Sequence, residues 1–174
     1  MQKRLLKIIF TLTLILSAWC ASTQYNKDYF FNMGRKLMTN NDYQEAIRVL
    51  NVLLRFDNNA YEGYFLRGIA KYNMDDLLGA DADFTLAIEK NPVFTNAYTY
   101  RAITRSRLGN YDDALKDFHE AIDLRPDLPG PYYSRGVTRL LNRIPRILFL
   151  FLSIIHNGIL RFMGIIGISG RPIR

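Results

Sequence analysis

The stretch GNYDDALKDF at Gly109–Phe118 decides the fold, because two related stretches precede it in the chain. They are NNDYQEAIRVL at residues 40–50 and LLGADADF at residues 77–84. Each stretch has an alanine at the same place, and these alanines lie 34 residues apart: Ala46, Ala80 and Ala114. A period of this length is typical of proteins built from stacked structural repeats, so the sequence predicts a repeat architecture.

Windows of this period begin at residue 27 and cover residues 27–60, 61–94, 95–128 and a half window at 129–141. An aromatic residue stands fourth in every window, at Phe30, Tyr64, Tyr98 and Tyr132. A small residue follows four places later, at Gly34, Gly68, Ala102 and Gly136. So many features in one register indicate that the windows are copies of one unit.

Apolar residues at spacings of three and four mark two helices in each window. The short polar turn between them contains Gly or Asn, which tolerate left-handed dihedrals, and Pro92 and Pro126 close the second helix of their windows. We expect Gly68 to face Ala80, so that the two helices approach closely. The sequence predicts seven antiparallel helices over residues 27–141, with breaks near 40–42, 57–60, 74–76, 91–94, 109–111 and 126–130.

The recurring aromatic–small pairs, the Tyr–x–x–Ala and Phe–x–x–Ala steps and the closing prolines resemble the tetratricopeptide repeat family. The resemblance covers residues 27–141. It implies an all-α fold, a right-handed α-solenoid of antiparallel helix hairpins with about three and a half 34-residue units. It also implies a concave groove that binds peptides or partner helices, and therefore a protein or peptide partner.

Charged residues follow the repeat as well. Asp83 and Asp117 stand sixteen residues after Arg67 and Arg101, whereas the first window has apolar residues at both places. This covariation suggests that the two places face each other across a hairpin. Chance agreement, or a contact from Arg101 back to Asp83 of the preceding repeat, remain alternatives. The fourth window has Arg135, but Phe151 stands where an acid is expected.

The family resemblance places the first helix of each repeat along the groove. It implies a mostly apolar and aromatic partner-binding set, although individual members could instead pack against neighbouring helices: Phe31, Arg35, Phe65, Ile69, Tyr72, Thr99, Ile103, Tyr133 and Val137. Family members that clamp chaperone C-termini use Lys, Asn, Asn, Lys and Arg in this groove. None of these matches the residues at the corresponding places, which argues against such a clamp: Phe31, Arg35, Leu66, Asn96 and Tyr100.

The formal net charge of +7 comes from the two ends of the chain. Residues 1–22 and 142–174 contain basic residues and no acids, while the segment between them is nearly neutral. A phosphate-binding surface on the repeats is therefore not expected, and we predict no nucleic-acid partner.

Residues 1–22 have the layout of a secretory signal peptide: a basic start, a short apolar run and small residues after it. We expect export to the periplasm or cell envelope of a Gram-negative bacterium. Cys20 is either lipidated, as in bacterial lipoproteins, or lies beside an ordinary cleavage site. A membrane association is thus possible through an uncleaved signal, through lipidated Cys20 or through the C-terminal tail.

The tail at residues 142–174 departs from the repeat, since it is apolar on every side and has no acid or alanine. It has three possible explanations: a frameshift or truncation inside the fourth repeat, a helix that caps the open end of the solenoid, or a membrane anchor. A frameshift or truncation fits the abrupt change of composition best.

Residues suited to catalysis are sparse, and we expect no enzyme activity, catalytic residues, cofactor or metal. His119 is interpreted as a surface residue, and the acid pairs Asp75–Asp76 and Asp112–Asp113 as helix-start residues. Phosphate-loop, zinc-protease and nucleophile-elbow motifs are absent. The sequence therefore predicts a protein-interaction scaffold. The alternatives are the targeting or regulatory module of an enzyme whose C-terminal catalytic part is missing, and a membrane-anchored envelope adaptor.

Overall fold

The computed structural model describes residues 2–165, and within them every regular element is a helix. The elements are α1 (Gln2–Thr39), α2 (Tyr43–Phe56), α3 (Tyr61–Asn73), α4 (Leu77–Lys90), α5 (Thr95–Arg107), α6 (Tyr111–Leu124) and α7 (Pro129–Ile165). The breaks over residues 27–141 fall where the repeat period predicts them, to within a residue or two. The predicted all-α fold is confirmed.

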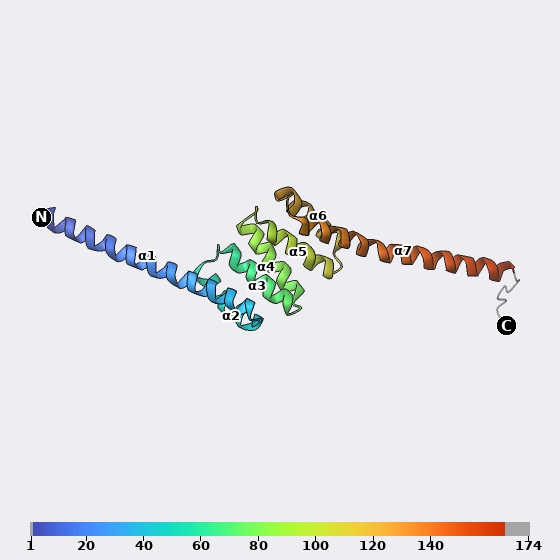
Figure 1. Ribbon diagram of the computed structural model, residues 1–174, viewed down its shortest axis with the longest axis horizontal. Helices are drawn as coiled ribbons and strands as arrows, with labels where there is room; N and C mark the ends of the chain where they lie inside the picture. Colours follow the sequence, from blue (N-terminus) through green and yellow to red (C-terminus); the bar gives the residue numbers. More distant parts are fainter. Residues whose placement is uncertain (1, 166–174) are drawn as a thin grey trace, which may run out of the picture.

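Consecutive helices pack as antiparallel hairpins, α1 with α2, α3 with α4 and α5 with α6, and the hairpins stack side by side (Figure 1). The helix α7 packs on α6 and begins a fourth hairpin that has no second helix among residues 2–165. The first part of α1 and the last part of α7 project from opposite ends of this stack (Figure 1). The architecture is that of an α-solenoid of about three and a half units.

One residue at the tip of each complete hairpin has the left-handed backbone conformation. These residues are Asn41, Asp75 and Gly109, with φ of 63°, 65° and 81°, and they occupy the same place in the three repeats. Gly, Asn and Asp are the residues that reach this region at least cost. The expected use of Gly and Asn in the turns is confirmed, and Asp75 does the same in the second hairpin.

The place that these three residues occupy is taken by Arg143 in the fourth window. Arginine adopts the left-handed region less readily than Gly, Asn or Asp, and no hairpin turn forms at this place. Instead α7 continues through Pro145 to Ile165. The helix therefore crosses residue 141, where the half window predicted from the sequence ends.

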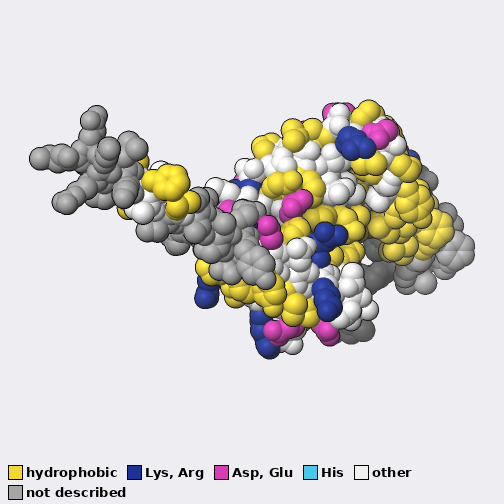
Figure 2. Space-filling model, turned by 60° about the vertical axis from the view of Figure 1, so that its left-hand side comes forward, with side chains coloured by type: hydrophobic (Ala, Val, Ile, Leu, Met, Phe, Trp, Pro, Cys, Tyr) yellow, Lys and Arg dark blue, Asp and Glu magenta, His cyan; other side chains and the backbone are white. Residues whose placement is uncertain are grey.

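The described tail runs away from the repeats rather than over their open end (Figure 1). Its apolar side chains are exposed, among them Ile147, Leu150, Phe151 and Ile154. Figure 2 shows hydrophobic side chains gathered at the end of the molecule away from the N-terminal segment. A capping helix is thus not seen in residues 142–165, and residues 166–174 lie outside the described part. Among the described helices, none combines the length and the apolar character that crossing a membrane requires.

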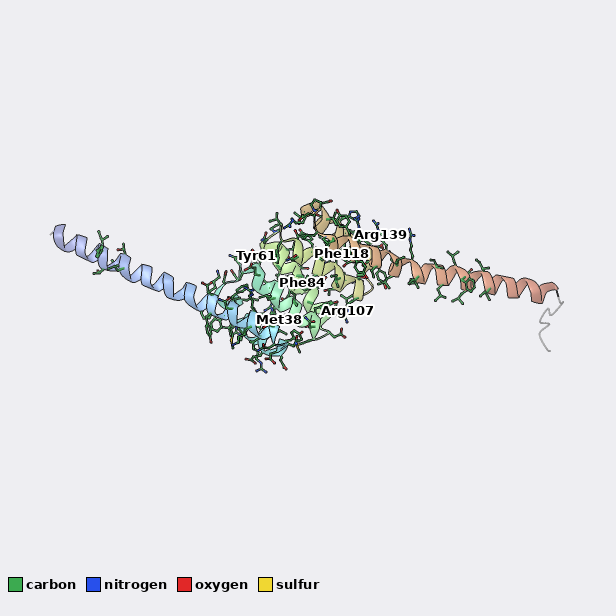
Figure 3. The ribbon with its side chains drawn as sticks, in the orientation of Figure 1. Met38, Tyr61, Phe84, Arg107, Phe118 and Arg139 are labelled. Atoms are coloured by element: carbon green, nitrogen blue, oxygen red, sulfur yellow. The ribbon has the colours of Figure 1, made fainter. Side chains whose placement is uncertain are left out.

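The core lies between the two helices of each hairpin and repeats with the same period. The three repeat alanines are fully buried, as are the large residues four places after them: Leu50, Phe84 and Phe118. Figure 3 shows Phe84 and Phe118 inside the stack. The small residue of the first helix receives this large side chain, since a Cβ added to Gly68 would lie 2.6 Å from the ring of Phe84. The atoms nearest to this place of Gly68 thus belong to Phe84, and the expected approach of Gly68 to Ala80 stays a prediction.

Candidate functional site

The predicted groove residues lie on the first helices α1, α3, α5 and α7, and three of them meet at one hollow. Ile103 of α5 faces Tyr133 and Val137 of α7 across a space of about 240 Å³. Arg107 and Leu141 complete its rim. Tyr133 is 77% exposed and has little contact with its own protein. The hollow is therefore an accessible, mainly apolar site between the third and fourth repeats.

A second hollow, of about 250 Å³, lies beside Phe31 at the other end of the solenoid. The turn between α2 and α3 forms part of its wall, and Lys27 makes an ion pair with Asp57 there. The hydrogen bond from Lys27 lowers the pKa of Asp57, against the opposite effect of burial. This hollow combines an aromatic side chain with a fixed ion pair.

The middle of the groove face is largely occupied by contacts within the protein. Phe65 packs its ring against those of Phe84, Phe94 and Tyr100, with centroids 4.9–5.8 Å apart. The ring of Phe65 therefore contributes to the core, which is the alternative role that the sequence left open for each groove residue.

Two further groove residues of the middle repeats have partners of their own. The guanidinium of Arg107 lies 4.9 Å from the ring centroid of Tyr72 and also pairs with Asp75. The hydroxyl of Thr99 donates to the carbonyl of Thr95 on its own helix. Ile69 is half-buried on α3, and Arg35 is exposed on α1. Sequence reasoning missed Arg107, which joins the second and third repeats.

The predicted arginine–aspartate contacts are present in the second and third hairpins. Arg67 donates from Nε and Nη2 to the two carboxylate oxygens of Asp83, at 2.9 and 2.6 Å. Its Nη1 reaches back to Asn51 of the preceding repeat. The alternative contact from Arg101 to Asp83 does not occur, because Arg101 pairs with Asp117 and its Nη1 bonds to Thr85 instead.

Each of these aspartates has a second cation that sequence analysis did not identify. Lys71 pairs with Asp83 at 2.8 Å, and Arg105 pairs with Asp117 at 2.9 Å. Both cations stand four residues after the first arginine, which places them on the same helix face. Two cations per carboxylate explain why these acids are tolerated at 2% and 6% side-chain exposure.

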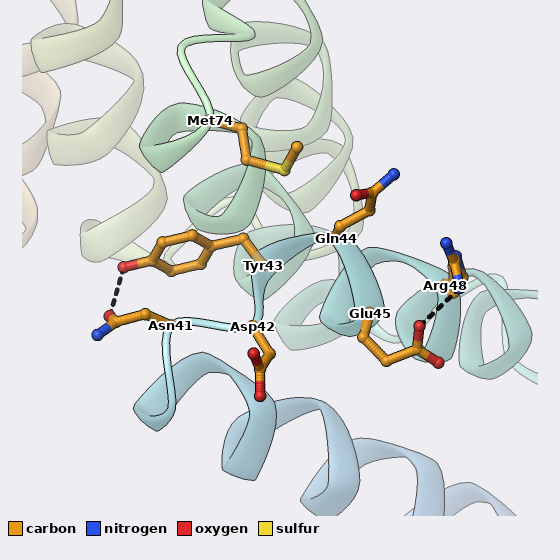
Figure 4. Close-up of a pocket in the computed structure, with 7 residues that line it drawn as sticks. All are labelled: Asn41, Asp42, Tyr43, Gln44, Glu45, Arg48 and Met74. Atoms are coloured by element: carbon orange, nitrogen blue, oxygen red, sulfur yellow. Dashed lines mark hydrogen bonds and ion pairs between the residues drawn. The ribbon is translucent and has the colours of Figure 1, made fainter.

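A polar hollow beside the turn between α1 and α2 is shown in Figure 4. The hydroxyl of Tyr43 donates to Asn41, and Arg48 pairs with Glu45 one turn away. Four of the polar side chains that line the hollow are thus engaged with one another within the protein.

Acid–base and metal chemistry find little support in the described part of the chain. No cluster of three potential metal ligands occurs among residues 2–165 for which side chains are placed. His119 is exposed on α6. Asp76 accepts a hydrogen bond from the backbone N–H of Gly79 and so caps α4, as expected for a helix-start acid. On the face in Figure 2, basic and acidic side chains are interspersed.

The family model for the tetratricopeptide repeat matches residues 95–128, which is the third predicted window. The third window is therefore identified as a tetratricopeptide repeat. The structure is similar to the first such domain of Spaghetti (RPAP3) bound to an HSP90 peptide, SRMEEVD, with a TM-score of 0.65 and 22% identity. That similarity covers 66% of this chain and 91% of the other.

Two relatives match parts of the repeat region in sequence. A Protein SGT1 homolog of Oryza sativa subsp. japonica is 37% identical over 62 residues, 36% of this chain. Tetratricopeptide repeat protein 16 of Mus musculus is 28% identical over 104 residues, 56% of this chain. The matches cover only 17% and 14% of these relatives' own lengths.

Proposed function

We propose that this tetratricopeptide repeat protein is a non-enzymatic scaffold that binds a peptide or partner helix with large apolar side chains. The observation that carries the proposal is the hollow between α5 and α7. There Ile103, Tyr133 and Val137 offer an accessible apolar surface. Aromatic and aliphatic anchors of a partner are held best by such concave, mainly apolar sites.

The chemistry of the groove favours an apolar ligand over an acidic peptide tail. The similar Spaghetti (RPAP3) domain is bound to a peptide that ends in EEVD. The clamp that the family uses for such tails needs lysine and arginine, and here two of those places hold Phe31 and Tyr100. Tyr100 packs on Phe65 and Phe84. The exposed Arg35 is a cation at one place where the clamp has asparagine.

The test is a selection of peptides from a displayed random library on the full chain, followed by affinity measurements. We expect enriched peptides with at least two large apolar side chains, and no measurable binding of the peptide SRMEEVD. The change Tyr133→Ala with Val137→Ala should weaken the selected peptides at least about tenfold, since buried aromatic anchors dominate such interfaces. Both residues are exposed, so these changes should not unfold the protein.

His119→Ala is the matched control, because His119 is exposed on the second helix α6, away from the groove. The affinity of the His119→Ala variant for the selected peptides should equal that of the unchanged chain. Unchanged affinity after the Tyr133 and Val137 changes would place binding outside this hollow and contradict the proposal. Preferential binding of SRMEEVD would contradict the predicted ligand class.

We also propose export, with the protein acting in the periplasm or cell envelope. The basic start and apolar run of residues 1–22 support this proposal. The side chain of Cys20, the possible lipidation site, lies outside the described residues. Expression in a Gram-negative host, fractionation and mass spectrometry should give a mature chain that begins within residues 18–22. A full-length chain in the cytoplasmic fraction would contradict export.

A further inference from the structure

Both complete hairpins built around Arg–Asp pairs join their helices by the same three elements. On α3 these are Arg67, Gly68 and Lys71; the two cations hold Asp83, and Gly68 receives the ring of Phe84. On α5 the corresponding residues are Arg101, Ala102 and Arg105, which face Asp117 and Phe118 of α6. The second helix thus carries an Asp–Phe pair, with an alanine three residues before the acid and another three residues after the phenylalanine.

The fourth repeat presents the first half of this arrangement on α7. Arg135, Gly136 and Arg139 occupy the places of Arg67, Gly68 and Lys71. We call this surface the terminal edge. The guanidinium of Arg135 lies 5.5 Å from the ring centroid of Tyr132, as that of Arg67 does from the ring of Tyr64. Arg135 therefore lies over its tyrosine as Arg67 does, and Arg67 in this position pairs with Asp83.

The second half of the arrangement is missing from the described part of the chain. A Cβ added to Gly136 would meet nothing within 4 Å, whereas Gly34 and Gly68 each face a large side chain. Neither Arg135 nor Arg139 has an acidic partner within the described residues, and the chain has no acid after Asp127. Figure 3 shows Arg139 on α7 near the point where this helix leaves the stack.

We propose that the terminal edge binds an amphipathic helix of another protein that carries the pattern Ala–x–x–Asp–Phe–x–x–Ala. The carboxylate would lie between Arg135 and Arg139, the phenylalanine ring over Gly136, and the alanines would allow close approach. Charge complementarity selects the acid, and the open space at Gly136 selects the large apolar residue next to it. This surface is distinct from the groove, because it faces the side of α7 on which a second helix packs in the other repeats.

The chain's own segments do not fit this surface. If the tail turned back as a second helix, Leu148 would stand where fully buried alanines stand in the other hairpins, and Phe151 would face the two arginines. A second copy offers no free segment of this kind, because both of its Asp–Phe pairs are buried inside its own hairpins.

The probe is a fluorescent peptide with the sequence of residues 109–126, which contains the Ala114, Asp117, Phe118 and Ala121 pattern. Its binding to the full chain is measured by anisotropy. We expect saturable binding that Gly136→Leu weakens at least about tenfold, since the added side chain fills the space for the ring. Gly130→Leu is the control: Gly130 lies on the same helix and is equally open, so affinity should stay within about twofold.

A charge exchange tests the arginines separately. A peptide with Asp117→Lys should lose binding to the unchanged chain and regain it when Arg135→Glu and Arg139→Glu are combined. Absence of saturable binding by the unchanged chain, or equal binding by the Gly136→Leu and Gly130→Leu variants, would overturn the proposal.

Two other occupants give their own signals, and either would also overturn the proposal. A dimer in sedimentation that Gly136→Leu abolishes would identify a second copy as the occupant. Efficient intrachain disulfide formation between Gly136→Cys and Leu152→Cys, in a chain with Cys20→Ser, would identify the tail.

Discussion

Arg101 and Asp117 form a bidentate ion pair across the third hairpin, with Nε and Nη2 donating to the two carboxylate oxygens at 2.9 and 2.7 Å. Arg105 adds a third bond to the same carboxylate at 2.9 Å. The side chain of Asp117 is nearly buried, so the charges are shielded from water and depend on one another. The pair therefore fixes the register of α5 against α6.

Removing this acid should destabilise the protein strongly. Asp117→Ala leaves part-buried Arg101 without its carboxylate and Arg105 with Asp81 alone, and breaking a buried pair costs about 3–5 kcal/mol. The measurement is a urea unfolding midpoint monitored by circular dichroism. Lys116→Ala on the same helix serves as the control. It removes only an exposed pair with Asp113, and should leave the unfolding midpoint almost unchanged. Equal midpoints for the two variants would contradict this account.

Enlarging the repeat alanines should also destabilise the protein. Ala80 and Ala114 have no exposed surface, so Ala80→Leu or Ala114→Leu forces neighbouring side chains apart at a cost of about 1–3 kcal/mol. Ala82→Leu on the same helix as Ala80 is the matched control, because Ala82 is exposed. Unfolding midpoints for the buried changes that equal the control would show that the helices do not cross tightly at these alanines.

Gly68 and Gly136 occupy equivalent places, but their replacement by alanine should change the stability of the protein in opposite directions. In Gly68→Ala the new methyl group meets the buried ring of Phe84, which must shift, and we expect a loss of about 1 kcal/mol. The cost is modest because Ala102 occupies the same place in the third repeat. Gly136→Ala meets open space and should stabilise α7 by about 0.5–1 kcal/mol through helix propensity. Thermal melts that move in the same direction would refute the contrast.

The ion pair between Arg125 and Asp127, in the turn before α7, should weaken at low pH. Hydrogen bonds from Arg125 lower the pKa of Asp127 from 3.8 to about 2, although both groups are exposed. Because the folded pKa lies below the unfolded one, the pair's stabilising effect is present above pH 3.8 and disappears as the pH falls through about 2. An NMR titration of the Asp127 carboxyl carbon should show this midpoint, and Arg125→Ala should raise it towards the ordinary value. A midpoint that stays the same in the variant would exclude Arg125 as the cause.

Removal of residues 142–174 should leave the repeats folded. The described tail projects from the stack, and its hydrogen bond from Asn142 to Asp112 is exposed and long at 3.3 Å. Losing a bond worth less than about 1 kcal/mol should shift the melting temperature by less than about 4 °C. Binding of a hydrophobic dye should fall, because the exposed apolar side chains of α7 after residue 141 are gone. A much lower melting temperature with increased dye binding would show that the tail covers the last repeat.

The fold could be predicted from the sequence because the same pattern occurs in three complete repeats. A position that departs from the pattern in one repeat is recognised from the other two. The contacts of Arg67 with Asp83 were predicted from covariation between repeats, without any geometric information. The second cations Lys71 and Arg105 also recur, twelve residues before their aspartates. They were missed because one position of the first helix was compared between repeats and not the helix face as a whole.

The groove could be predicted only as a face, and not as a set of free side chains. Whether Phe65 serves a ligand or the core depends on Phe94 and Tyr100, which lie in other helices and approach it only in the folded stack. The continuation of α7 past Leu141 was missed for a different reason. The change in composition was interpreted as the end of a helix, although the residues that follow are themselves compatible with one.

The left-handed residues at the hairpin tips have a consequence for how the array grows. Asn41, Asp75 and Gly109 are all exposed, and each lies outside the core that it brings together. The chain thus reverses at one exposed residue in each of the three hairpins, and it continues as a helix where Arg143 takes that place. We therefore expect that Arg143→Gly, followed by a grafted copy of α6, would extend the stack by one closed hairpin. The aspartate of the grafted helix would then pair with Arg135 and Arg139.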